Sequence, residues 1–500
     1  MQQLKKRWVS SLVVLGISMA ALTAPPSVFA ETVPGAPAPT NPTPPAPALP
    51  AVPAQVVSPV RVGLEWGLAT ADVTAPGGLY VIGDGVMQAQ LPAGQVVKVT
   101  LDAGKLTVAG ITPKFDSVRL VPVPPPAPAP ATPAPPPTTT QPAPAPVVPD
   151  APPAKPANPI TYKGKAYRGE IQAVVGPVSK KLSVVNVVNL DEYLLSVVPE
   201  EVEATWPVEA VKAQAVAART YALANNKWVG DGFSLRWTTD DQYYGGLASE
   251  KGASNLAVWV TRGQVLTYDG RLISAMYHSS SGGYTENNEI IYGGTAVGYL
   301  RGVQDYDNVE GNRYYTWQKS LTIDEFTAAL KKWGHDVGSV SAVAPAGNPG
   351  ASGRWTQWLI TGSTASKPLT GRQMRDALNL LSNPKAITVQ TGGLSPAVKS
   401  YTDAQTFVAL GAGGTVVQRT AAGTAVVAAG KASAMVAGAV TAMGARLNQP
   451  AGVVVSGGGN GHAVGMSQWG ALGMAKLGKT YAEILTHYYT GTKLETRQTQ

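Results

Sequence analysis

The stretch VVPEEVEATWPVEAVKAQAVAARTYAL, residues 197–223, carries the strongest structural signal in this chain of 500 residues. Its second half predicts a helix from about Trp206 to Lys227, because Pro207 suits the first turn of a helix and Glu209 favours its positive end. The body of this helix is largely alanine, so another element can approach its backbone closely. We therefore expect neighbouring elements to pack tightly against it.

Large polar side chains recur at regular intervals on this helix. Lys212 and Arg219 lie seven residues apart and share one face, and Gln214 and Tyr221 share another. Regular placement among alanines suits a ligand-binding surface, although a solvated Lys/Arg face is the commoner origin of such a pattern. The spacing alone leaves both interpretations open.

Three glutamates, Glu200, Glu201 and Glu203, stand before the helix and after a segment that we interpret as an apolar strand. A carboxyl group at such a junction can be partly buried, which raises its pKa toward the value that a general acid needs. Glutamates before a helix are also commonly solvated, or favoured there by the helix dipole. A catalytic carboxyl is one interpretation of this cluster.

A second polar segment, AMYHSSSGGYTEN, covers residues 275–287. Its hydroxyl and backbone groups around His278 and Ser280 could bind sugar hydroxyls. A Ser/His hydrolase is the alternative, although the sequence has no GxSxG nucleophile elbow. A turn that holds a hydrogen-bonded histidine explains the segment equally well.

A third segment, GGGNGHAVGMSQWGALGMA, covers residues 457–475 and leads into a helix of small residues. His462, Gln468 and Trp469 stand out in it, because an indole ring can stack on a sugar ring while an amide binds its hydroxyls. The glycines match neither GxxxxGK[ST] nor a GxGxxG that follows a strand. We therefore expect this loop to bind sugar rather than a nucleotide.

The N-terminus has the features of a secretory signal. Lys5, Lys6 and Arg7 precede an apolar stretch, and Val28-Phe29-Ala30 gives a small-x-small cleavage pattern. Residues 1–30 are therefore predicted to direct export to the cell wall or the medium. Retention as an uncleaved membrane anchor is the alternative.

Composition divides the remaining chain into four parts. Residues 31–55 and 124–160 are Pro/Ala-rich linkers, which cannot bury a core. Residues 56–123 alternate apolar and polar side chains and predict a small all-β module. Residues 161–495 mix strands and helices without regular βαβ alternation, which indicates an α+β domain.

The net charge leaves the class of partner open, whereas the lack of cysteine and of paired histidines argues against a bound metal. The formal net charge of +8 suits an acidic partner, yet no basic run indicates nucleic-acid reading. The chain has no cysteine, and His278, His335, His462 and His487 form no metal-binding pair. We expect neither a metal nor another cofactor.

Together and in this order, these segments resemble the SpoIID/LytB family of sporulation and cell-wall proteins. The family's motif has a YL-x-x-VV-x-x-E segment and a W-P-x-E-A helix ending in A-A-R-T-Y, found here from Tyr193 to Tyr221. YHSSSGGYTEN, GHAVGMSQWGA and TYAEILTHYYTGT follow, and the resemblance covers about two thirds of the chain. Ala463 replaces a glycine of the third motif. The stretch from Thr239 to Gly245 lacks the zinc ligands of some members, which implies a metal-free protein.

The resemblance implies a peptidoglycan lytic transglycosylase used in wall remodelling or sporulation, acting on glycan strands stripped of stem peptides. It implies that Glu201 is the catalytic glutamate. Site positions implied by the motifs, together with neighbouring polar and aromatic residues, are Lys212, Gln214, Arg219, Tyr221, His278, Ser280, His462, Gln468 and Trp469. The alternative within the family is a non-catalytic, peptidoglycan-binding amidase enhancer. Its partners would be glycan strands and a wall amidase or another wall-remodelling protein.

Overall fold

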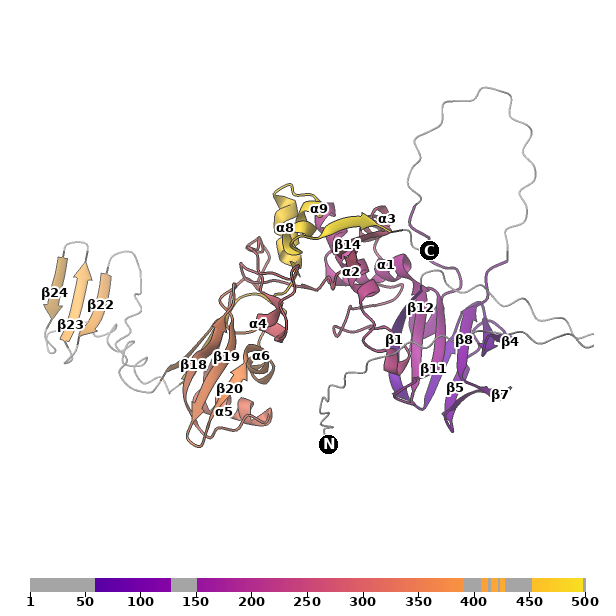
Figure 1. Ribbon diagram of the computed structural model, residues 1–500, viewed down its shortest axis with the longest axis horizontal. Helices are drawn as coiled ribbons and strands as arrows, with labels where there is room; N and C mark the ends of the chain where they lie inside the picture. Colours follow the sequence, from indigo (N-terminus) through magenta and orange to yellow (C-terminus); the bar gives the residue numbers. More distant parts are fainter. Residues whose placement is uncertain are drawn as a thin grey trace, which may run out of the picture. The chain divides into compact units, whose positions relative to one another are not determined.

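The computed structural model describes residues 59–126, 151–390 and 452–497. It also gives the backbone of three strands, β22 (Thr406–Gly411), β23 (Thr415–Thr420) and β24 (Gly423–Val427), which pair in one sheet. Helices and mainly antiparallel sheets are mixed along the chain, which confirms the predicted α+β class (Figure 1). The expected signal, the first linker and most of the second linker lie outside the described residues.

Two sheets share one hydrophobic core in the N-terminal part of the fold. In order across the seven-stranded sheet, the strands are β13 (Leu235–Arg236), β1 (Pro59–Leu68), β12 (Leu182–Asn189), β11 (Glu170–Val175), β8 (Ser117–Pro122), β3 (Leu79–Gly83) and β4 (Val86–Leu91). In the six-stranded sheet they are β10 (Lys165–Tyr167), β9 (Ile160–Tyr162), β2 (Thr70–Thr74), β5 (Val97–Asp102), β6 (Lys105–Val108) and β7 (Ile111–Phe115).

Strands on both sides of the Pro-rich linker at 124–160 pair with one another. β1 runs antiparallel to β12, from Pro59 opposite Asn189 to Leu68 opposite Leu182, and β8 pairs with β11. β2 also pairs with β9 in the other sheet. The predicted β module at 56–123 and the start of the 161–495 region are thus built into common sheets.

Three helices follow these sheets: α1 (Leu190–Glu201), α2 (Val208–Ala224) and α3 (Gly252–Val260). α1 begins directly after β12, where the Asn189 side chain accepts a hydrogen bond from the Asp191 backbone N–H at 2.9 Å. The prediction of an apolar strand directly before Glu200 is therefore wrong, because this segment is helical up to Glu201. α2 is shorter at both ends than predicted.

The alanine-rich helix α2 lies at the centre of the second half of the fold. It contacts α1, α3, α8 (Gln468–Lys476), α9 (Tyr481–Tyr488) and β14 (Gln264–Tyr268). Ala213, Ala217 and Ala218 are fully buried in these contacts. Small side chains on every face let neighbouring elements pack tightly against α2, as its composition predicts.

Short strands join the C-terminal residues to this centre. β14 pairs with β15 (Arg271–Leu272) and β27 (Lys493–Thr496), while β16 (Tyr277–His278) runs parallel to β26 (Met466–Ser467). The parallel pair brings the second and third polar segments together, with Tyr277 opposite Met466 and His278 opposite Ser467. The remaining short helices are η1 (Val229–Asp231) and α4 (Asn288–Tyr292).

The described residues from 317 to 390 and from 452 to 457, which come between β16 and β26 in the sequence, build a further hydrophobic core. Its described elements are β17 (Trp317–Thr322), α5 (Ile323–Lys332), β18 (Val340–Pro349), β19 (Trp355–Gly362), β20 (Ser366–Thr370), α6 (Gly371–Leu378), β21 (Ala386–Gln390) and β25 (Gly452–Gly457). Phe326, Trp358 and Met374 are buried in this core. We call this region the 317–457 segment.

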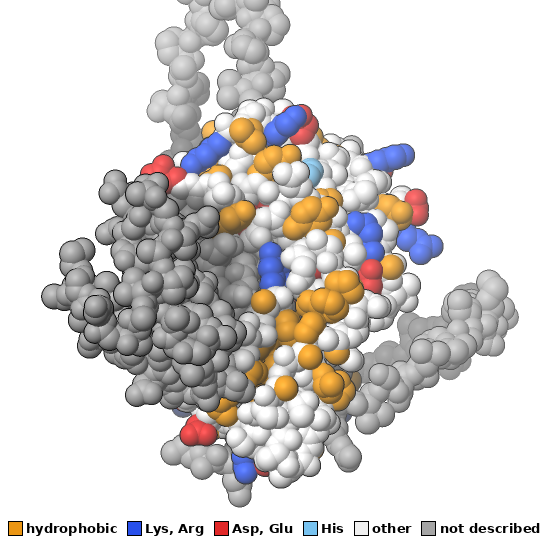
Figure 2. Space-filling model, turned by 90° about the vertical axis from the view of Figure 1, so that its left-hand side faces the viewer, with side chains coloured by type: hydrophobic (Ala, Val, Ile, Leu, Met, Phe, Trp, Pro, Cys, Tyr) orange, Lys and Arg blue, Asp and Glu red, His pale blue; other side chains and the backbone are white. Residues whose placement is uncertain are grey.

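Side chains of all kinds mix on the molecular face shown in Figure 2, where hydrophobic groups form a broken band among lysines, arginines and acidic groups. In the 317–457 segment, exposed large hydrophobic side chains include Trp333, Leu359 and Leu381. Among the described residues, no helix combines the length and hydropathy needed for a membrane span.

Candidate active site

Glu201 is the last residue of α1, and its carboxyl is contacted by three other parts of the chain. The Gln468 side chain donates a hydrogen bond to Oε2 at 3.0 Å, and the Tyr243 backbone N–H donates to Oε1 at 3.3 Å. The Tyr277 hydroxyl is a third hydrogen-bonding partner. These contacts hold the carboxyl between the end of α1, the start of α8 and β16.

The environment of Glu201 suits a proton donor. Burial raises the pKa of its carboxyl above the ordinary value of 4.5, and the neighbouring charge of Glu200 acts in the same direction. The hydrogen bonds from Gln468, Tyr243 and Tyr277 oppose this shift, but burial outweighs them. A glutamic acid held in this way keeps its proton to a higher pH than a solvated one.

The segment Asp241-Gln242-Tyr243 contacts the acid through the Tyr243 backbone and contacts Tyr277 through the Gln242 side chain. The buried Gln242 amide donates to the Tyr277 hydroxyl at 2.9 Å and accepts from the Tyr193 hydroxyl at 3.1 Å. Tyr193 and Tyr277 are thereby fixed on either side of Gln242. The orientation of the tyrosine that contacts Glu201 is set by this amide.

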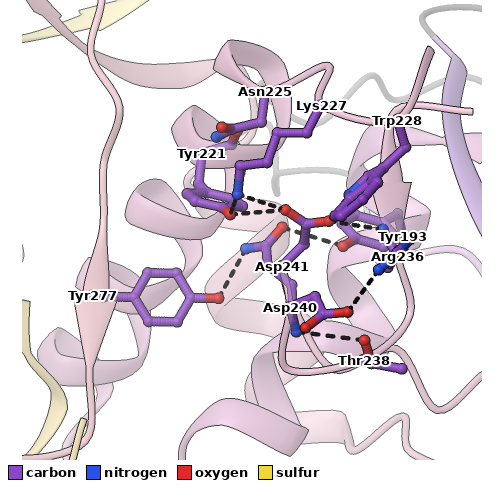
Figure 3. Close-up of polar contacts among 11 residues, drawn as sticks. Tyr193, Tyr221, Asn225, Lys227, Trp228, Arg236, Thr238, Asp240, Asp241 and Tyr277 are labelled. Atoms are coloured by element: carbon purple, nitrogen blue, oxygen red, sulfur yellow. Dashed lines mark hydrogen bonds and ion pairs between the residues drawn. The ribbon is translucent and has the colours of Figure 1, made fainter. Parts of the chain in front are cut away.

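Asp241 holds the neighbouring strand and helix ends together (Figure 3). Its carboxylate accepts hydrogen bonds from the Tyr221 hydroxyl at 2.9 Å, from Lys227 at 2.8 Å and from the Trp228 indole at 2.6 Å. Tyr221 is therefore a packing and hydrogen-bonding residue whose ring lies 6.3 Å from that of Tyr277.

An aromatic groove is lined by residues close in sequence to Glu201 and Gln468. Trp206 and Trp469 approach with ring centroids 5.2 Å apart, and both line a groove of about 610 Å³. Glu203 and Tyr314 lie in its walls. Trp469 directly follows Gln468, and Glu203 lies two residues after Glu201, so the groove is lined by sequence neighbours of the Glu201–Gln468 pair. Two indole rings in an open groove suit the face of a sugar ring.

Of the polar residues predicted on α2, Lys212, Gln214 and Arg219 form no hydrogen bond or ion pair with Glu201 in the part of the chain that the structure describes. Lys212 pairs with Glu209 at 2.8 Å, and Gln214 is fully buried without a hydrogen-bond partner among the described residues. Arg219 is also fully buried, and it pairs with Asp191 at 2.9 Å. The Arg219 guanidinium therefore joins α2 to the start of α1 rather than facing a ligand.

His278 ends β16, Ser280 lies in the loop that follows, and the two side chains make separate contacts. Ser280 Oγ donates to Asp307 at 2.6 Å, while His278 Nδ1 contacts the Val464 carbonyl at 3.2 Å. Both side chains are buried, and neither contact joins the serine to the histidine. This arrangement does not place a serine nucleophile beside a histidine base.

His462 is the more open of the two histidines, with its ring 5.3 Å from His278 and 6.0 Å from Tyr292. Burial, followed by the charge of Arg375, lowers the pKa of His462 to about 4. Its Nδ1 accepts a hydrogen bond from the Val464 backbone N–H at 3.1 Å. His462 is therefore neutral at physiological pH, with Nδ1 as an acceptor.

Sequence reasoning missed a buried carboxylate pair, Asp305 and Asp307. Asp307 accepts hydrogen bonds from the backbone N–H groups of residues 281, 282 and 283, which shapes the Ser/Gly loop. Asp305 accepts from Tyr488 at 2.6 Å, and burial with the charge of Asp307 raises its pKa to about 6. Both carboxylates lie in a short DYDN sequence that has no recognisable motif.

Tyr277, Tyr243 and Gln242 were also missed, although they contact Glu201 or its immediate partners. Tyr277 directly precedes His278 in a quoted motif, so it was the residue most open to recognition. The contact of Tyr243 runs through its backbone, which no side-chain pattern reveals. In the described ranges there is no group of three or more His, Asp or Glu residues that could hold a metal ion.

Comparisons with known proteins agree with these motifs. The family model described as "Stage II sporulation protein" matches residues 178–268, which include α1, α2, α3 and Glu201. The chain is 28% identical to an uncharacterized protein of Brachyspira hyodysenteriae over 67% of this chain and 73% of the relative.

Two relatives from Bacillus subtilis are similar over comparable lengths. The stage II sporulation protein D of that organism is 29% identical, over 61% of this chain and 74% of its own length. Its amidase enhancer is also 29% identical, over 68% of this chain, but the match spans 45% of the enhancer.

Proposed function

Because this chain belongs to the SpoIID/LytB family, we propose that it is an exported lytic transglycosylase that cleaves peptidoglycan glycan strands with Glu201 as acid and base. The observation that carries this proposal is the Glu201 carboxyl, whose pKa is raised by burial and whose hydrogen-bond partner Gln468 directly precedes Trp469, one of two tryptophans that line an open groove. The same proposal implies a role in wall remodelling or sporulation.

In the proposed reaction, the Glu201 carboxylic acid protonates the glycosidic oxygen between MurNAc and GlcNAc. The bond from MurNAc C1 to this oxygen breaks, and GlcNAc leaves with a free hydroxyl. The C6 hydroxyl of the same MurNAc then attacks C1, and the Glu201 carboxylate takes up its proton. The product is a 1,6-anhydro end, and no water is consumed, unlike hydrolysis by two carboxylates.

The other contacts of the site would serve this cycle. Gln468, Tyr243 and Tyr277 hold the two carboxyl oxygens in a fixed orientation and stabilise the carboxylate that forms after proton transfer. Trp206 and Trp469 would stack on sugar rings and hold the strand along the groove. Positioning and proton transfer are thus divided between different elements.

The decisive experiment is digestion of purified, peptide-free glycan strands by the full chain, followed by mass analysis of the ends. Residues 59–122 must be included, because their strands share sheets and a core with β11 and β12. We expect 1,6-anhydro ends with the native chain and none with Glu201→Gln. Glu495→Gln, which removes a partly exposed carboxylate of β27, serves as the matched control.

The second candidate is a non-catalytic, peptidoglycan-binding amidase enhancer, supported by the similarity to the Bacillus subtilis protein of that name. It predicts that the chain binds glycan strands without forming anhydro products. It also predicts that a wall amidase cleaves its substrate faster when the chain is added. In that case Glu201→Gln would leave the enhancement unchanged. A Ser/His hydrolase would instead lose its activity in Ser280→Ala and keep it in Glu201→Gln.

A further inference from the structure

A second pair of aromatic rings lies on the loop that contacts Glu201 through its backbone. The Tyr243 ring packs against the Trp237 ring, with the ring centroids 5.7 Å apart and the ring planes inclined by 58°. The backbone N–H of the same Tyr243 donates to Glu201 Oε1 at 3.3 Å. One member of this aromatic pair is therefore in direct contact with the proposed acid.

The loop that carries the pair is closed by its own hydrogen bonds. The Tyr244 backbone N–H donates to the Trp237 carbonyl at 3.0 Å, which joins the two ends of the loop. At the turn between them, the Asp241 carboxylate accepts from the Arg236 backbone N–H at 2.9 Å and from the Trp228 indole at 2.6 Å (Figure 3). The two rings are thus held in place by the loop, so a ligand loses little affinity to ordering them.

Three hydrogen-bond donors on this surface have no hydrogen-bond partner among the described residues. They are the Trp237 indole N–H, the Tyr243 hydroxyl and the ammonium group of Lys165, which lies 4.6 Å from the centroid of the Trp237 ring. Lys165 is exposed, the two aromatic residues are partly exposed, and none of the three donors is among the buried polar atoms that lack a partner. Aromatic rings beside free donors suit a sugar, which presents C–H groups on its faces and oxygen atoms at its edge.

Two donors hold the Glu201 carboxyl, and each is associated with a pair of aromatic rings. Gln468, which donates to Oε2, directly precedes Trp469 of the groove. Tyr243, which donates to Oε1, itself belongs to the second pair. The two aromatic pairs are thus linked to different oxygens of one carboxyl. A glycan strand whose interior bond lies at Glu201 extends past this bond in both directions, so it needs a support on each side.

We propose that Trp237 and Tyr243 form a second sugar-binding subsite, which holds the part of the strand on the opposite side of the scissile bond from the groove. This assignment rests on the proposed function and adds substrate-positioning residues to it. One sugar ring would stack on the aromatic pair. The Lys165 ammonium, on its flexible stem, would move from the indole face to the oxygen atoms of this sugar. The scissile bond at Glu201 would then lie between two supported sugars.

Binding of a peptide-free octasaccharide tests this subsite without cleavage. The full chain carrying Glu201→Gln is titrated with the octasaccharide by calorimetry. We expect Trp237→Ala, added to this background, to weaken binding about tenfold, because it removes a stacking ring. Tyr243→Leu keeps the backbone N–H that binds the carboxyl and removes the second ring, so it should weaken binding by a similar factor.

A double variant distinguishes two subsites from one. If Trp237 and Trp469 support different sugars of the same strand, their losses in binding free energy add, and Trp237→Ala with Trp469→Ala should bind about a hundredfold more weakly than the parent chain. A double variant that binds as tightly as Trp469→Ala alone would overturn the second subsite.

Trp259→Ala is the matched control, because Trp259 on α3 is also partly buried and also has a cation near its ring, with Arg262 5.2 Å from the ring centroid. It should bind normally. Native affinity in Trp237→Ala would overturn the proposal, as would an equal loss in Trp259→Ala.

Thermal unfolding of each variant shows whether it is folded under the conditions of the titration. Should Trp237→Ala fail to fold, Lys165→Gln at its exposed site decides the question. Binding about threefold weaker than that of the parent would support the subsite, and native affinity would overturn it. Absence of any binding by the parent chain would overturn the proposed function as well, whereas failure of the Glu201 chemistry alone would leave these outcomes unchanged.

Discussion

Gln468, the first residue of α8, donates a hydrogen bond of 3.0 Å to Glu201, the last residue of α1, across 267 positions of sequence. The contact joins the first and third motifs of the chain at one carboxyl group. It also opposes the effect of burial on the pKa of that carboxyl. The start of α8 therefore sets both the position and the acidity of Glu201.

Replacing Gln468 with leucine should change the pH dependence of glycan cleavage. The acid must be protonated to act, so the rate is high below its pKa and falls as the pH rises through it. Gln468 lowers the pKa of Glu201, and its loss should move the alkaline limb of the rate profile to higher pH. Gln318→Leu, at an exposed site on β17, should leave the limb in place. An acid shift of the limb would contradict this role.

Trp469→Ala should weaken glycan binding about tenfold, because it removes one of two indole rings from the groove. Isothermal titration with peptide-free strands, in the Glu201→Gln background, measures the effect without turnover. Trp333→Ala removes a tryptophan that is 53% exposed at the end of α5 and should bind normally. Equal losses in the two variants would argue against the groove.

Gly470→Ala should destabilise the fold by roughly 1–3 kcal/mol, the usual cost of overpacking. A Cβ atom at this position would lie 1.8 Å from an Asp305 carboxyl oxygen and 2.0 Å from the Tyr488 hydroxyl. The start of α8 would have to move, and Gln468 would move with it. Urea unfolding checks the stability, and Gly252→Ala at the start of α3, where a Cβ meets no neighbour, is the control.

Arg219→Gln should destabilise the protein by about 3 kcal/mol, because it leaves the buried Asp191 carboxylate without its cation. Lys479→Gln breaks an exposed pair with Glu483 and should change stability little. Chemical denaturation distinguishes the two roles of Arg219. A variant of native stability that loses glycan affinity would restore the substrate-binding role implied by the resemblance.

Ala463→Gly should stabilise the protein by up to about 1 kcal/mol, since the left-handed backbone conformation costs alanine more than glycine. Ala463 has a φ of 65° and stands where the family motif has glycine. Asn379→Gly, also at a left-handed position with a φ of 49°, should gain less because asparagine tolerates this region. Thermal unfolding of both variants provides the measurement, and a clear loss at position 463 would contradict the assignment.

Local patterns predicted the helices best where composition was extreme. The alanine-rich α2 and the C-terminal α9 were both expected, but α1 was misread because its run LLSVV is short and apolar. The signals that mark α1 are Asn189 at its cap and Asp191 and Glu192 in its first turn. They were present in the sequence but weaker than the apolar run.

The sequence by itself singled out the segments that form the candidate site, because the motif residues Glu201, Gln468 and Trp469 are recognisable by type and spacing. Only the tertiary structure decided which of them meet. Arg219 was expected to face a ligand and is buried against Asp191, whereas Tyr277 and the Tyr243 backbone approach Glu201 unpredicted. The physical reason is that the pKa and reach of a carboxyl depend on burial and on partners distant in sequence, which local patterns do not encode.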